Sequence, residues 1–124
     1  MGSSRIVQLT VGEPITLPPA LVASYPELGG VRWRRGGVPV LVAGWCLGQR
    51  SAAAITLWRT VFLSTGVRLS PELLLHEFRH VEQFAASLAF PLRYLWESVR
   101  RGYFDNRYEA DARAFAARRL GGAE

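Results

Sequence analysis

Residues His76-Glu77-Phe78-Arg79-His80 decide how the rest of this chain is interpreted. They read H-E-x-x-H and lie in a segment with helical patterning, where residues four positions apart lie on the same face. His76 and His80 are the two histidines of the chain, and on one helical face they can hold a metal ion between them. Glu77 is then placed to reach a water molecule on that ion. The alternative interpretation is a surface helix that carries these residue types by coincidence.

The helix that carries this motif has a clear predicted start. Ser70 is a preferred N-cap residue, and Pro71 suits the first helical position because its missing N–H would be unpaired there. Glu72 favours the positive end of the helix dipole. Apolar residues then recur at helical spacing, which predicts a buried stripe beside the two histidines: Leu74, Phe78, Val81, Ala85 and Leu88.

Two further helices are expected after the motif. Pro91 should break the first helix, and a second is predicted from about residue 91 to residue 101, before Gly102. Its apolar start, residues 90–96, is interpreted as core rather than as a surface that lies on lipid. The last helix is predicted from about residue 106 to residue 120, and its repeated alanines favour close approach to a neighbouring helix.

The third metal ligand must be a carboxylate, because a hydrolytic zinc site uses three protein ligands and no third histidine exists. Glu109 is favoured because it shares a helical face with the small residues Ala112 and Ala116, although Asn106-x-x-Glu109 also fits a capping box. Asp111 lies about 200° around the helix from Glu109, so the two cannot both face one metal. The other carboxylates considered are Glu82, Glu97, Asp105 and Asp111, of which Asp111 and Glu97 remain alternatives.

The N-terminal half carries weaker signals. A strand is predicted over residues 38–46, and alternating apolar residues predict a second, antiparallel strand over residues 54–63. Residues 1–24 could form a loosely packed arm. Within and after it, we expect an edge strand at residues 6–11, a short helix over residues 20–25, and a strand or exposed ribbon at residues 31–35.

Length and composition restrict the class of protein. A chain of 124 residues with 49% apolar residues is expected to form a single domain, residues 1–124. The net charge of +5 comes from dispersed arginines, so nucleic-acid binding is disfavoured. One cysteine, Cys46, excludes an internal disulfide and is interpreted as a small buried residue. Neither a signal peptide nor a transmembrane segment is evident, which favours a cytoplasmic location.

The C-terminal half resembles compact bacterial gluzincin-type zinc metallopeptidases, and is similar to small uncharacterised domains with H-E-x-x-H-x-x-Q and a downstream N-x-x-E-x-E-A. The matching stretches are residues 76–83 and residues 106–112, with Asp111 where the pattern often has Glu. The resemblance implies an α+β, zincin-like fold, in which a small antiparallel sheet packs on the metal-binding helix and two more helices follow. It implies His76, His80 and Glu109 as ligands of Zn²⁺, and Glu77 as general base. It also implies an edge strand, for which residues 54–63 are the candidate, that pairs with an extended peptide substrate.

The expected function is therefore hydrolysis of peptide bonds in a peptide or protein substrate. Two other classes stay open: a non-catalytic or latent zinc-binding domain, and a nucleic-acid-associated metalloprotein. The sequence does not choose the donor for the oxyanion among Tyr94, Tyr103, Tyr108 and a nearby arginine, nor does it assign Gln83 or Asp111 as partners that orient a ligand. The oligomeric state is not readable from the sequence.

Overall fold

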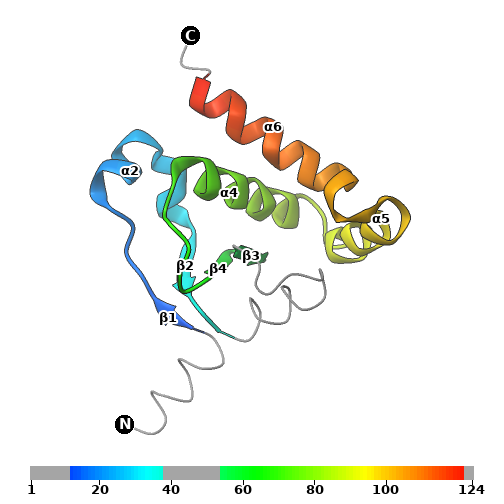
Figure 1. Ribbon diagram of the computed structural model, residues 1–124, viewed down its shortest axis with the longest axis horizontal. Coiled ribbons are helices and arrows are strands. Elements are labelled where there is room, and N and C mark those ends of the chain that lie inside the picture. Colours follow the sequence, from blue (N-terminus) through cyan, green and yellow to red (C-terminus); the bar gives the residue numbers. More distant parts are fainter. Residues whose placement is uncertain (1–11, 38–53, 122–124) are drawn as a thin grey trace, which may run out of the picture. The chain divides into compact units, whose positions relative to one another are not determined.

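The computed structural model describes residues 12–37 and 54–121 (Figure 1). The chain forms two compact units, residues 1–68 and residues 69–124. The first unit carries the strands, and the second consists of helices. Together these elements make an α+β protein, as predicted. The prediction of one domain with residues 1–24 as an arm stays a prediction.

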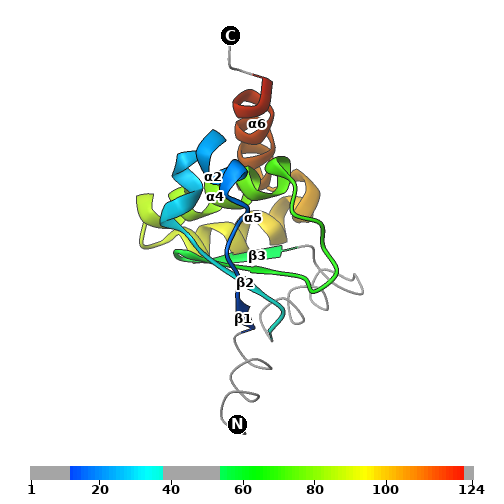
Figure 2. The ribbon, with the colours of Figure 1, turned by 90° about the vertical axis from the view of Figure 1, so that its left-hand side faces the viewer.

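The first unit contains a four-stranded mixed sheet in the order β1-β2-β4-β3. Figure 2 labels β1, β2 and β3 of this sheet. Its strands are β1 (Glu13–Pro14), β2 (Arg32–Arg35), β3 (Ala54–Leu57) and β4 (Thr60–Leu63). β2 pairs with β4 in parallel, whereas the other two pairs are antiparallel. The expectation of an antiparallel sheet was therefore wrong for the central pair. The chain between β2 and β4 is long enough for the crossover that a parallel pair requires.

The run of residues 54–63 is a hairpin, where a single strand was predicted. β3 and β4 pair in antiparallel register with Leu57 opposite Thr60, so Trp58 and Arg59 form the turn. Trp58 has φ 55°, a left-handed conformation that is uncommon for a residue other than glycine. The guanidinium of Arg59 donates to the carbonyl oxygen of Gly30 at 2.7 Å, and its own carbonyl accepts from the amide of Arg32. These long-range hydrogen bonds hold a turn that lacks the usual Gly, Asn or Asp.

The segment between β1 and β2 follows the predictions more closely. The short helix α2 spans Pro19–Ser24, and a 3-10 helix, η1 (Pro26–Gly30), follows it. The predicted strand or ribbon at residues 31–35 is the strand β2 (Arg32–Arg35), and the indole N–H of Trp33 donates to the carbonyl of Leu28 at 3.0 Å. The predicted strands at residues 6–11 and 38–46, with Cys46, lie outside the described residues.

The second unit consists of α4 (Pro71–Ala86), α5 (Phe90–Asp105) and α6 (Arg107–Gly121). α4 begins as predicted, because the Ser70 hydroxyl accepts from the amide of Leu73 at 3.1 Å. α5 is interrupted at Gly102, whose φ of 81° is not helical, so the predicted end there corresponds to a break. α6 packs mainly against α4, and its buried residues include Ala112 and Ala116, as expected of the small face.

Two expectations about apolar residues were wrong. The stripe on α4 is buried at Leu74 and Val81, but Ala85 is exposed in the last turn and Leu88 is exposed after the helix has ended at Ala86. The apolar start of α5 was expected in the core, yet three of its large side chains are more than half exposed: Leu92, Leu95 and Trp96. Among the described residues, no helix combines the length and the apolar character needed to cross a membrane.

Candidate metal centre

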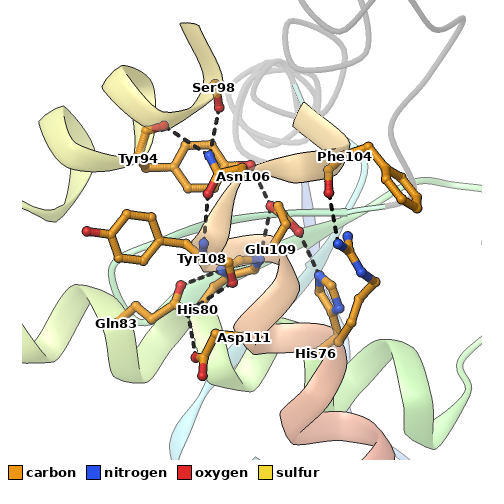
Figure 3. A network of polar contacts seen from close by, with 11 residues as sticks. His76, His80, Gln83, Tyr94, Ser98, Phe104, Asn106, Tyr108, Glu109 and Asp111 are labelled. Carbon is orange, nitrogen blue, oxygen red and sulfur yellow. Dashed lines mark hydrogen bonds and ion pairs between the residues drawn. The ribbon is translucent and has the colours of Figure 1, made fainter. Parts of the chain in front are cut away.

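Three side chains of the helical unit converge on one point (Figure 3). His76, His80 and Glu109 each offer one ligand atom, and these atoms lie within 4.8 Å of one another. The Nε2 atom of His76 is 2.9 Å from Oε1 of Glu109, and Nε2 of His80 is 3.1 Å from Oε2. The group can hold a metal ion, and its members are the residues that the sequence favoured as ligands.

The helices bring these side chains together for simple geometric reasons. His76 and His80 are one turn apart on α4, so their rings meet edge to face with centroids 5.0 Å apart. Glu109 lies on the face of α6 that also carries Ala112 and Ala116, which are 0% and 1% exposed. Because these alanines let α6 approach α4 closely, the short side chain of Glu109 reaches both imidazoles.

Gln83 fixes the orientation of the His80 ring. Its amide nitrogen donates to the carbonyl of Tyr108 at 3.1 Å and to Oδ2 of Asp111 at 3.0 Å, and both of these partners only accept. The amide oxygen of Gln83 must therefore face Nδ1 of His80, 2.7 Å away, and accept its proton. In the neutral imidazole, Nε2 then carries the lone pair and points at Glu109, which is the form that binds a metal.

Asp111, which accepts from Gln83, is held in turn by Arg79. Nε of Arg79 donates to Oδ2 of Asp111 at 2.7 Å, and the same guanidinium lies 5.1 Å from the ring centroid of Phe115. The pair holds the pKa of Asp111 below its ordinary value, chiefly through the hydrogen bond from Arg79. Asp111 thus positions Gln83 and lies away from the three candidate ligands, in agreement with its predicted direction around α6.

Tyr94 and Asn106 hold Glu109 from α5 and from the start of α6. The hydroxyl of Tyr94 donates to Oε2 of Glu109 at 2.5 Å. Asn106 is fully buried, and its amide group donates to the carbonyl of Tyr94 and to the hydroxyl of Ser98. Its side-chain oxygen accepts from the amide of Tyr108, which caps α6. One asparagine therefore joins the tyrosine to the helix that carries the carboxylate.

The charges of the site support one another. Burial lowers the pKa of His80, but the carboxylates of Glu109 and Glu77 outweigh it and raise that pKa to about 9. Burial likewise raises the pKa of Glu109, but the two histidines and the Tyr94 hydroxyl hold it well below its ordinary range. The site without metal is therefore an imidazolium paired with a carboxylate, and a bound cation would take the place of the proton.

The remaining carboxylates have other roles. Glu82 is exposed and pairs with Arg79 at 3.0 Å, and Asp105 is also exposed. Glu97 is buried, and its carboxylate accepts from the backbone amide of Arg107 at the start of α6. Glu97 thus helps to cap α6, whereas the two oxygens of Glu109 contact side chains of α4 and α5 and make no capping box.

Two residues at the site, Tyr94 and Arg79, were not predicted to make the contacts that they make. Tyr94 was considered only as an oxyanion donor, and nothing in its spacing pointed to Glu109. Arg79 was not considered, although its position inside the motif placed it beside the site. The hydroxyl of Tyr108 accepts from Arg107, outside the three candidate ligands.

One buried atom tests whether a metal fits. Nε2 of His80 is close to Glu109 but not aligned for a hydrogen bond, and within residues 12–37 and 54–121 it is the one buried side-chain nitrogen or oxygen without a hydrogen-bond partner. Such an atom is costly unless something binds it. A cation between the two imidazoles and the carboxylate would satisfy it, so the donor set fits a metal ion.

Comparisons with protein-family models, with curated proteins and with solved structures found no match to this chain.

Proposed function

We propose that this chain is a zinc-dependent metallopeptidase of the gluzincin type with a zincin-like fold, in which His76, His80 and Glu109 hold Zn²⁺. The observation that carries the proposal is the convergence of these three side chains, with the buried Nε2 of His80 3.1 Å from the Glu109 carboxylate and without a hydrogen-bond partner. Two imidazoles and a carboxylate are a ligand set typical of catalytic zinc, which keeps one position open.

In the proposed mechanism, the chain itself supplies the base, Glu77. When bound, zinc would supply Lewis acidity, which lowers the pKa of water and polarises a carbonyl group. Glu77 follows His76 directly, is 6% exposed, and lies near enough to His80 for its charge to raise the pKa of that imidazole. We assign its carboxylate as the base that accepts a proton from water and passes it to the leaving nitrogen of a peptide bond.

Gln83 and Tyr94 have positioning roles in this proposal. Gln83 holds the Nδ1 proton of His80, which keeps the Nε2 lone pair available. Tyr94 holds one oxygen of Glu109, which limits the directions that the carboxylate can take. Partners of this kind typically change metal affinity by about 10- to 100-fold when they are removed.

The proposal is tested by metal content and by three variants. The purified wild type should contain one zinc per chain and cleave an unfolded protein such as casein. Glu77→Gln should keep the zinc and the fold but lose the cleavage, because Glu77 is a base and not a ligand. Glu109→Ala should weaken zinc binding by at least about tenfold, whereas Asp111→Ala should change it only a few-fold.

Each outcome has a separate meaning. Glu72→Gln, which changes an exposed carboxylate in the first turn of α4, is the matched control for Glu77→Gln. A wild type that stays free of metal when zinc is supplied refutes the centre. Stoichiometric zinc without cleavage of any substrate, together with unfolding on chelation, would instead identify a non-catalytic zinc domain.

A further inference from the structure

The outward face of α5 is apolar and uncovered in the helical unit. Four large side chains at helical spacing are between 61% and 74% exposed, and we call them the outer stripe: Leu92, Leu95, Trp96 and Val99. The opposite face of the same helix is used for packing, since Phe90 is 3% exposed and Glu97 is 4% exposed. The buried face therefore mixes an aromatic residue with a charged one, whereas the outer stripe is apolar and does not contact the other helices.

Basic side chains border this stripe on one side. Arg93 and Arg100 are exposed and lie three residues before and four residues after Trp96, so they are its neighbours on the helix surface. The acidic residues of α5 do not balance them. Glu97 is buried on the opposite face, and Asp105 lies beyond the break at Gly102.

We propose that the outer stripe lies on an anionic lipid surface. Tryptophan and leucine on one face with arginine beside them are typical of helices that lie in the membrane interface, where the rings enter the acyl boundary and the arginines reach lipid phosphates. The net charge of +5 acts in the same direction. A second copy of the chain is a poorer occupant, because pairing two stripes would bring the arginines of both copies together.

Vesicle sedimentation tests this proposal with the full chain. The wild type should bind vesicles of phosphatidylcholine with about one-third phosphatidylglycerol, and bind phosphatidylcholine alone at least about tenfold more weakly. The double variant Leu95→Ser/Trp96→Ser should reduce binding to the anionic vesicles by at least about tenfold. Trp58→Ser is the matched control, because Trp58 and Trp96 are both 62% exposed, and it should bind as the wild type does.

A charge variant gives an independent readout. Arg93→Glu/Arg100→Glu should weaken binding to the anionic vesicles. Added salt should reduce the difference in vesicle affinity between this variant and the wild type, because salt screens exposed charges. Arg32→Glu/Arg68→Glu changes the net charge equally at two exposed positions of the other unit and should retain most of the binding. Equal loss in both charge variants would overturn the placement on α5. No binding by the wild type would overturn the proposal, as would a wild-type dimer that Leu95→Ser/Trp96→Ser turns into a monomer.

Discussion

Raising the pH should destabilise the metal-free protein and leave the stability of the zinc-loaded protein nearly unchanged. In the metal-free protein, the pKa of His80 is about 9 against an ordinary value of 6.5, so the folded state holds the proton more tightly than the unfolded state does. The stability from this difference is fully present below pH 6.5 and is lost as the pH rises through about 9. The shift corresponds to about 3 kcal/mol of unfolding free energy over that window. The depressed pKa of Glu109 describes the same attraction and is not added to this figure.

In the zinc-loaded protein this loss should be offset by tighter zinc binding, so the unfolding free energy with excess zinc should change little over the same window. Zinc must displace the proton from Nε2 of His80, so its apparent affinity should rise about tenfold per pH unit between about pH 7 and pH 8.5. Urea denaturation of the protein with a chelator and with excess zinc, followed by circular dichroism, measures both trends. Calorimetric zinc titrations in buffers of different ionisation enthalpy count the released proton directly.

The variant Glu109→Gln supplies the control. It removes the carboxylate that raises the pKa of His80 and keeps a side chain of similar size. Without metal, its stability should depend on pH much less than that of the wild type over the same window. If the metal-free wild type instead gains stability with rising pH, or shows no dependence, the assigned protonation of His80 is wrong.

Three further variants test the supports of the site. Gln83→Leu should weaken zinc binding by about 10- to 100-fold in a chelator competition, because Nδ1 of His80 loses its acceptor; unchanged affinity would remove its positioning role. Tyr94→Phe deletes the hydroxyl that donates to Glu109 and should cost about 1–3 kcal/mol of stability without metal. A Tyr94→Phe protein as stable as the wild type would show that this contact adds nothing. Ser70→Ala removes the cap of α4 and should lower the unfolding free energy by about 1 kcal/mol while zinc affinity stays the same.

The candidate ligands could be predicted because they depend on local rules. The spacing of His76 and His80 fixes their common face as soon as the segment is a helix, and the start signals at Ser70 and Pro71 place that helix. Glu109 followed from the small face of α6, since alanines tell which side packs closely. These inferences needed periodicity and capping chemistry, both of which operate within a few residues of the chain.

The parts that escaped prediction depend on distant partners. The turn at Trp58 has no residue that favours it, and Arg59 bonds with Gly30 and Arg32, which come earlier in the chain. The parallel pairing of β2 with β4 is likewise a choice between strands far apart in sequence. The partner that Arg79 finds in Asp111 is 32 positions away. Contacts of this kind leave no periodic signal.

The helix α5 takes part in both proposed binding events, that of the metal ion on one face and that of the lipid surface on the other. Tyr94 and the backbone that Asn106 holds are on the side of Glu109, and the outer stripe is on the other. In the sequence, the whole of α5 lies between His80 and Glu109. An ion held by these two residues would therefore close a loop of the chain that contains α5. Linkage then imposes reciprocity: the factor by which zinc changes the affinity for vesicles must equal the factor by which vesicles change the affinity for zinc. A factor other than one would make an anionic surface an effector of the metal centre, and the ion an effector of membrane attachment.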